Sequence, residues 1–267
     1  LSTSKDGVVT VVKKLPKGAD YRRLELSFQK QESAWRDHWA SPLKVPQVLN
    51  TSTPGEFEME LVPGIPLGEF ISRTSWHNLE RVVGKIETYL VRGEVKKKPD
   101  THLLWEKLMG VKKSLTNTYS EGVSKLSDNT LEKAIEIINN IRPQTSISHG
   151  DFSMDNLLVV PGDLDVYVVD FLDGPMENRV EDFGRLWLDV SVGWWRSSEP
   201  THSELWARSM LGRAMNRAAK ENGISETALN CLALVAALRI FPYSMAPARR
   251  GRMLSAINKL CEGVDQS

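Results

Sequence analysis

Three side chains that could act together in one reaction are Asp151, Asn156 and Asp170. The first two belong to the stretch H-G-D-F-S-M-D-N at 149–156, and the third closes a valine-rich run further along the chain. A carboxylate can orient an attacking hydroxyl and take its proton, and carboxylate and amide oxygens are ligands that magnesium prefers. Phosphoryl transfer asks a protein mainly for positioning and charge stabilisation, which such a set can provide.

The spacing D-x-x-x-x-N of Asp151 and Asn156 is that of a kinase catalytic loop, with the aspartate as base and the asparagine as metal ligand. The two apolar runs 156–160 and 166–170 flank Pro161-Gly162-Asp163, which is typical of a β-hairpin. We expect this hairpin to return Asp170, at the end of its second strand, to the side of the loop. The pattern therefore predicts a site for ATP and Mg²⁺, with Asp151 as catalytic base and Asn156 and Asp170 as metal ligands.

The elements before this site are mostly strands. Residues 8–14 are rich in valine and follow the turn signal Lys5-Asp6-Gly7, which predicts the second strand of a hairpin. Residues 20–39 contain no Pro or Gly and predict a helix. Residues 45–49 and 56–62 are expected to be short strands.

After Pro63-Gly64 the pattern becomes helical. Residues 79–141 have helical spacing nearly throughout, with Asp128 as the expected N-cap of the last helix. Helical spacing returns from Glu181 onward, and the apolar run 228–241 predicts a buried helix that is too short to cross a membrane.

This change of character predicts an α+β fold with two unequal lobes. The first is a small β-rich nucleotide-binding lobe over residues 1–62. The second is a larger, mostly helical lobe over residues 63–267, which carries the catalytic loop and the acceptor site.

Composition excludes several classes of protein. Lys and Arg together number 34, as do Asp and Glu, so net charge gives no reason to expect nucleic acid or a membrane as partner. The two cysteines, Cys231 and Cys261, form no C-x-x-C pair, which argues against a disulfide scaffold or a zinc site and fits the cytoplasm. The oligomeric state is not predicted.

With these residues in place, the sequence resembles the aminoglycoside phosphotransferase and choline kinase superfamily, the small-molecule branch of the protein-kinase-like fold. The family pattern H-G-D-x-x-x-x-N, then an apolar strand ending in D-F, then an aspartate that opens a helix, is matched at 149–156, 166–171 and Asp182. The resemblance implies that Asp182 supports the catalytic loop and that His149 packs and hydrogen-bonds rather than acting as a base.

The resemblance also implies a lysine that contacts the α- and β-phosphates. Lys13 in V-V-K-K-L fits best, with Lys14 as the alternative. Its partner carboxylate is expected on the following helix, where Glu32 suits the family spacing and Glu25 is the alternative.

The run F-E-M-E-L-V-P-G at 57–64 resembles the hinge between the family's lobes. It implies that adenine is bound by the carbonyl of Glu60 and the amide of Val62. One departure from the family is that no glycine-rich, phosphate-covering loop precedes the lysine strand.

The implied function is ATP- and magnesium-dependent transfer of the γ-phosphate to a hydroxyl of a small molecule, such as a sugar, an aminocyclitol or an amino alcohol. The alternative is a non-catalytic nucleotide-binding pseudokinase module. A protein kinase is disfavoured because no A-P-E segment follows Asp170. The basic run 249–252 favours an anionic acceptor over a polycation, unless it is a solvated helix end. Trp187, Trp194 and Trp195 could line a quaternary-ammonium site or belong to the core.

Overall fold

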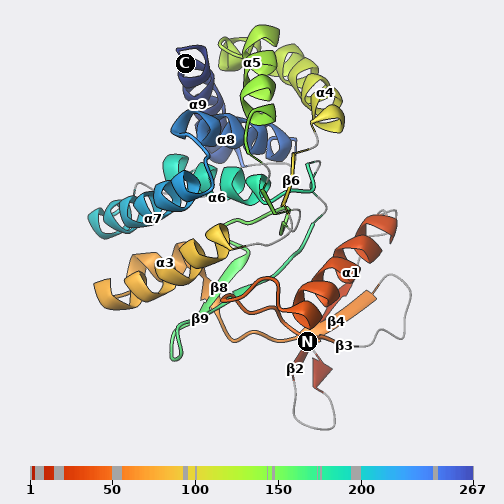
Figure 1. Cartoon of the computed structure of the whole chain (residues 1–267), viewed down its shortest axis with the longest axis vertical. Coiled ribbons are helices and arrows are strands. Elements are labelled where there is room, and N and C mark those ends of the chain that lie inside the picture. Colours follow the sequence, from red (N-terminus) through yellow and green to blue (C-terminus); the bar gives the residue numbers. More distant parts are fainter. Residues whose placement is uncertain are drawn as a thin grey trace. The chain divides into compact units, whose positions relative to one another are not determined.

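The computed structural model describes residues 2–3, 9–14, 21–49, 56–92, 96–99, 101–142, 144–145, 148–172, 174, 176–193, 200–242 and 246–266. The chain divides into two compact units (Figure 1). The first joins Leu1–Tyr89 to His149–Asp173, and the second joins Leu90–Ser148 to Gly174–Ser267. The predicted division into lobes 1–62 and 63–267 stays a prediction.

The first unit contains a four-stranded antiparallel sheet in the order β1-β2-β4-β3. Its strands are β1 (Ser2–Thr3), β2 (Val9–Lys14), β3 (Val48–Leu49) and β4 (Glu56–Glu60). The predicted hairpin is confirmed, because β1 pairs with β2, and its turn lies outside the described residues. The predicted strand 45–49 is shorter than expected.

Helix α1 (Tyr21–Asp37) confirms the helix predicted at 20–39 and packs on β3. Its inner face carries Ser27, Gln31 and Ala34, at the i, i+4, i+7 spacing of one helix face. The Gln31 amide is buried and lies 3.5 Å from the sulfur of Met59 on β4. The helix is therefore oriented on the sheet by a polar side chain as well as by apolar ones.

A second antiparallel sheet in this unit has the order β5-β8-β9. It consists of β5 (Ile65–Pro66), β8 (Leu157–Val160) and β9 (Asp165–Val168), with α2 (Leu67–Arg73) packed on β5 and β8. The predicted hairpin is confirmed. Its second strand ends at Val168, so the expectation that Asp170 ends the strand is wrong by two residues, because the chain turns into left-handed backbone there.

Asp165, at the start of β9, ties three segments of the first unit together. Its carboxylate binds Lys44 (2.5 Å) and Lys85 of α3 (Trp76–Val91; 3.1 Å). The backbone of Lys44 also bonds to Val166 and Val168 at 2.8 Å each. The hydrogen bond from Lys44 is the main cause that lowers the pKa of Asp165 and raises that of Lys44.

The described part of the second unit is built of helices, with one short strand pair, β6 (Lys96–Lys97) with β7 (Gln144–Thr145). The helices of its described part are α4 (His102–Tyr119), η1 (Ser120–Val123), α5 (Asp128–Asn139), α6 (Val180–Val192), α7 (His202–Glu221), α8 (Glu226–Ile240) and α9 (Pro247–Asp265). The expected N-cap Asp128 is wrong by one residue. Ser127 is the cap, since its side chain accepts from the N–H of Thr130.

Helix α8 is at the centre of this unit, and it confirms the buried helix predicted for the apolar run 228–241. Its residues from Ala228 to Leu238 are buried except for Asn230, and α4, α5, α6, α7 and α9 all pack on it. Gly184 of α6 lies directly against the backbone of Leu232. No described helix by itself is long and apolar enough to cross a membrane. Taken together, α7 and α8 reach that length and apolarity, but the chain bends by 112° between them.

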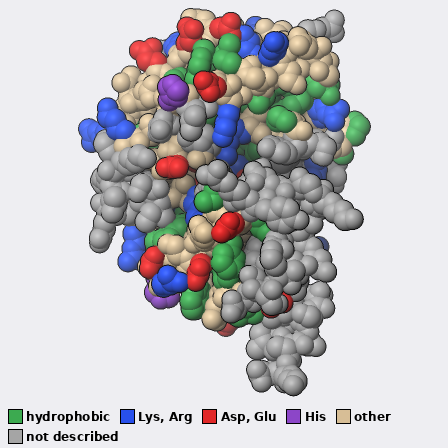
Figure 2. Space-filling model, turned by 90° about the vertical axis from the view of Figure 1, so that its right-hand side faces the viewer, with side chains coloured by type: hydrophobic (Ala, Val, Ile, Leu, Met, Phe, Trp, Pro, Cys, Tyr) green, Lys and Arg blue, Asp and Glu red, His purple; other side chains and the backbone are tan. Residues whose placement is uncertain are grey.

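The surface of the described residues mixes both signs of charge. Lys and Arg side chains lie among Asp and Glu side chains over the face that Figure 2 shows. Cys231 and Cys261 are unpaired thiols in the core, and burial raises the pKa of each to about 12.

Candidate functional site

His149 opens the predicted catalytic loop and is fully buried. Its Nε2 lies 2.8 Å from the carbonyl of Val169, and its Nδ1 accepts the N–H of Asp151 at 3.2 Å. A ring that accepts at Nδ1 donates at Nε2, so both nitrogens are used to shape the loop. The ring also packs on Phe171, with centroids 4.4 Å apart. His149 therefore has the packing and hydrogen-bonding contacts that the resemblance implied.

Asp151 and Asn156 are joined across the loop. The Asn156 Nδ2 donates to the backbone carbonyl of Asp151 at 2.9 Å and to its carboxylate Oδ2 at 3.0 Å. Gly150, between His149 and Asp151, has a φ of 88°, a conformation open to glycine and strained for other residues. The loop thus turns sharply enough to place the two side chains predicted as base and metal ligand in direct contact.

Asp170 lies on the chain segment that borders this loop. Just before it, the N–H of Val169 donates to the carbonyl of Asn156 at 3.0 Å. Two residues after it, the N–H of Leu172 donates to the carbonyl of His149 at 3.0 Å. Asp170 itself has a φ of 60°, which is uncommon for a residue with a side chain. The backbone therefore brings together the three residues that the sequence singled out.

Helix α1 also binds the segment that carries Asp170. The hydroxyl of Ser27 donates to the carbonyl of Phe171, and Lys30 Nζ donates to that of Leu172 at 2.6 Å. Trp39 packs edge-on against the Phe171 ring, with centroids 5.6 Å apart. Ser27 and Lys30 were not singled out from the sequence. Helical spacing places Ser27 on the buried face with Ala34, but no pattern identifies a distant carbonyl as the partner.

The predicted phosphate-binding lysine lies in β2, where the backbone of Lys13 pairs with Phe57. Its side chain is outside what the structure describes, as is that of Lys14. Glu32 lies on α1, and its carboxylate is bound by Arg36 at 2.7 Å. The pairing of Lys13 with Glu32 stays a prediction, and Glu25 is exposed on the same helix.

The predicted hinge begins at the end of β4. The N–H of Glu60 donates to the carbonyl of Gln47 at 2.9 Å. The N–H of Val62 finds no acceptor among the described residues. Adenine binding by the backbone of Glu60 and Val62 stays a prediction. It requires a donor at the Val62 amide, and that N–H is not used by any described residue.

Asp182 lies in the helical unit, in the first turn of α6, and is fully buried. Its carboxylate lies 3.7 Å from Nε of Arg179, and its proposed support of the loop stays a prediction.

Of the three tryptophans considered for an ammonium site, Trp187 donates its indole N–H to Asn230 of α8 at 3.0 Å. Trp194 and Trp195 lie outside the described residues.

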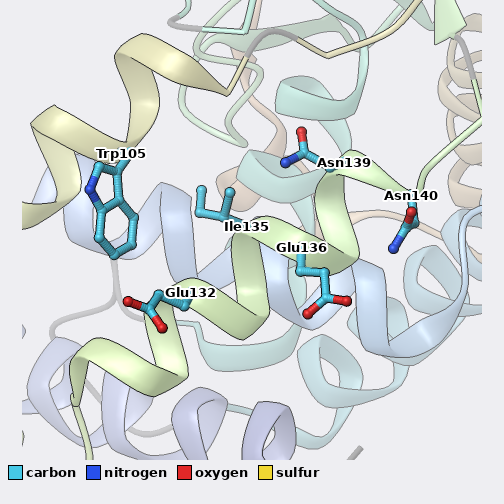
Figure 3. A pocket seen from close by; sticks show the side chains of 6 residues that line it. All are labelled: Trp105, Glu132, Ile135, Glu136, Asn139 and Asn140. Carbon is cyan, nitrogen blue, oxygen red and sulfur yellow. The ribbon is translucent and has the colours of Figure 1, made fainter.

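A separate groove of about 560 Å³ lies between α4 and α5 of the helical unit (Figure 3). It is lined by an indole, an aliphatic side chain, two exposed carboxylates and two amides: Trp105, Ile135, Glu132, Glu136, Asn139 and Asn140. None of the predicted site residues lines it, so we assign it no part in phosphate transfer.

Comparison with known proteins identifies the fold. No protein-family model matches the sequence, and no curated protein sequence matches it. Solved structures do match. An ethanolamine kinase from Plasmodium vivax aligns with 97% of this chain and 77% of its own, at 10% identity and a TM-score of 0.55. The chain has the fold of this small-molecule kinase.

Two further kinases of this fold extend the comparison. A choline/ethanolamine kinase family protein from Mesorhizobium loti matches at 15% identity and a TM-score of 0.53, covering 97% of this chain and 87% of its own. The aminoglycoside phosphotransferase APH(2″)-IIa, in complex with gentamicin, matches at 15% identity and a TM-score of 0.52, covering 97% and 85%. The α+β kinase-like fold that the resemblance implied is thus confirmed.

Proposed function

We propose that this protein is a small-molecule kinase, which transfers the γ-phosphate of ATP, with Mg²⁺, to a hydroxyl of a small molecule. Asp151 would orient the acceptor hydroxyl and take its proton. Asn156 and Asp170 would hold the magnesium ion. Lys13, paired with Glu32, would contact the phosphates, and the backbone of Glu60 and Val62 would bind adenine.

The observation that carries this proposal is the contact between Asn156 and Asp151. Because Nδ2 of Asn156 donates to Asp151, the other amide atom of Asn156, Oδ1, is the one that can act as an acceptor. No described residue donates to Oδ1. An amide oxygen without a donor suits a cation, and Asp170 on the bordering segment adds a carboxylate.

Two protein ligands, Asn156 and Asp170, are in keeping with a magnesium site. Magnesium usually takes only one or two protein ligands and completes its shell with phosphate and water oxygens. When bound, the magnesium nucleotide would supply the phosphoryl group and neutralise charge on its oxygens.

The acceptor is proposed by class only: a sugar, an aminocyclitol or an amino alcohol. Support comes from the fold, since the matching structures include an ethanolamine kinase and an aminoglycoside phosphotransferase bound to gentamicin. Ethanolamine and gentamicin both carry hydroxyl and amine groups.

We propose that the protein has no nucleic acid or membrane partner. We also propose a cytoplasmic location, which the two unpaired core thiols favour.

The test is an ATP-consumption assay with a panel of ethanolamine, choline, sugars and aminoglycosides. Wild type should release ADP above background with at least one acceptor. Asp151→Asn should lower turnover by roughly 10²–10⁴-fold while ATP still binds, because the proton acceptor is lost while an amide oxygen can still accept from Asn156. Asp155→Asn is the matched control, since Asp155 is exposed on the same loop.

Two outcomes would contradict the proposal. If Asp151→Asn and Asp155→Asn turn over equally, Asp151 is not the base. If ATP binds with magnesium but no acceptor raises ADP release, the chain is the nucleotide-binding module considered as the alternative.

A further inference from the structure

Helix α1 makes two hydrogen bonds to the residues that follow Asp170. The hydroxyl of Ser27 donates to the carbonyl of Phe171, and the ammonium of Lys30 donates to the carbonyl of Leu172 at 2.6 Å. Ser27 and Lys30 have the i, i+3 spacing that places side chains on one face of a helix. All of these residues belong to the first unit. One face of α1 therefore binds two successive carbonyls next to Asp170.

The helix that provides these donors is itself held on the sheet. Gln31, next to Lys30 in the chain, is buried. Its amide nitrogen donates to the carbonyl of Pro46 at 3.4 Å and lies 3.5 Å from the sulfur of Met59 on β4. Ala34, one turn further along the helix, is fully buried. Because α1 is packed on the sheet in this way, its donors hold the carbonyls at a defined place.

The segment 169–172 is hydrogen-bonded on two sides. On one side, the N–H of Val169 donates to the carbonyl of Asn156, and the N–H of Leu172 donates to that of His149, at 3.0 Å each. On the other side, the carbonyls at positions 171 and 172 accept from α1. The position of the segment is therefore set jointly by the catalytic loop and by α1.

Asp170 lies inside this segment and has a φ of 60°, which few residues with a side chain adopt. Such a conformation persists where surrounding contacts hold it. We propose that Ser27 and Lys30 are positioning residues, which hold the two carbonyls and thereby restrict where Asp170 places its carboxylate. This inference rests on the proposed function, in which Asp170 binds magnesium.

The physical basis is the support that metal ligands need. A carboxylate binds a cation well when its own position is restrained, and loss of such outer support typically weakens metal binding. A hydrogen bond from a charged donor is shorter and stronger than one from a neutral donor. The ammonium of Lys30 should therefore restrain the segment more than the hydroxyl of Ser27.

The test compares variants of the two donors. Lys30→Met removes the ammonium and keeps a long side chain, Lys30→Arg keeps a charged donor, and Ser27→Ala removes the hydroxyl. Lys85→Met is the matched control. Lys85 also donates to a backbone carbonyl, that of Leu164 at 2.8 Å, but Leu164 precedes β9 whereas Asp170 follows it.

Three measurements are made on each protein. The first is the magnesium midpoint, which is the magnesium concentration that gives half-maximal activity at saturating ATP. The second is hydrogen exchange at the Leu172 amide without nucleotide, which reports the restraint of the segment independently of activity. The third is calorimetric titration of ATP with and without magnesium. Thermal midpoints show how far each variant is destabilised.

We expect Lys30→Met to raise the magnesium midpoint by roughly 10-fold or more, to reduce the gain in ATP affinity on adding magnesium, and to speed exchange at the Leu172 amide. Ser27→Ala should change the same quantities in the same direction by less. Lys30→Arg should stay close to wild type. Lys85→Met should lower the thermal midpoint without changing the magnesium midpoint or the exchange at Leu172.

A folded Lys30→Met with the wild-type magnesium midpoint would overturn the positioning role. If Lys30→Met does not fold, Ser27→Ala decides, and an unchanged midpoint there overturns the role. A raised midpoint without faster exchange at Leu172 would also overturn it, because Lys30 would then act by another route.

The control and the conservative variant can contradict the inference as well. An equal shift of the magnesium midpoint in Lys85→Met would show a general effect of destabilising the first unit. A Lys30→Arg that behaves like Lys30→Met would show that the donor is not what matters. A wild-type chain whose ATP binding does not respond to magnesium would instead overturn the proposed function on which the inference rests.

Discussion

Asn156 donates from one amide nitrogen to both the backbone carbonyl and the carboxylate of Asp151, at 2.9 and 3.0 Å. The proposed base and the proposed metal ligand are therefore one hydrogen-bonded unit rather than two independent groups. A change that removes these hydrogen bonds should disturb the function of both residues.

Replacing Asn156 by leucine, which is similar in volume, should therefore impair two steps together. It removes the donor that orients Asp151 and the oxygen proposed to bind magnesium. We expect turnover to fall by roughly 10²-fold and the magnesium midpoint to rise, since both proton transfer and metal binding depend on this side chain. Steady-state kinetics over a magnesium series would measure both; a fall in turnover with an unchanged magnesium midpoint would assign Asn156 to loop structure alone.

Asp170→Asn keeps the shape of the side chain and removes its charge. Because a neutral amide is a weaker magnesium ligand than a carboxylate, ATP affinity should no longer increase when magnesium is added. Calorimetric titration of ATP with and without magnesium measures this directly. ATP affinities equal to those of wild type, both with and without magnesium, would remove Asp170 from the metal site.

Asp165 should make the stability of the first unit depend on pH. Hydrogen bonds from Lys44 and Lys85 lower its pKa in the folded state. The stabilisation is therefore fully present above the unfolded pKa, about 3.9, and is lost as the pH falls through the lower folded value. Asp165→Asn should cost about 1 kcal/mol or less near neutral pH, because Lys44 is about half exposed.

Urea unfolding of wild type and Asp165→Asn at neutral and acid pH would test this dependence. The difference between the two proteins should shrink toward acid pH. Asp163→Asn, an exposed neighbour in the same hairpin turn, serves as the control. A difference that is constant with pH would contradict the role of the carboxylate charge.

Gly184 should be required for the packing of α6 on α8. A Cβ there would lie 2.6 Å from the Leu232 carbonyl oxygen, which is backbone and cannot move aside. Gly184→Ala should therefore destabilise the protein by about 1–3 kcal/mol. Gly110→Ala, in α4 with nothing within 4 Å of the added methyl, should instead stabilise it by up to about 1 kcal/mol. Thermal midpoints that move in the same direction would contradict this assignment.

The sequence by itself determined the local parts of the site. The five-residue interval from Asp151 to Asn156, the hairpin after it and the helix at 21–37 follow from spacing and turn residues, because these are short-range properties of the chain. The resemblance built on them named the kinase-like fold correctly. It also assigned His149 to packing, and the structure gives that ring contacts with Val169 and Phe171.

Only the tertiary structure decided which distant residues support that site. Ser27 and Lys30 bind carbonyls 144 and 142 residues away. Their partners are backbone groups, which leave no periodic trace in the sequence. The left-handed turn at Asp170 is likewise set by the hydrogen bonds of Val169 and Leu172 to the catalytic loop. Local spacing determines which groups are available for chemistry, and long-range contacts determine where those groups are placed.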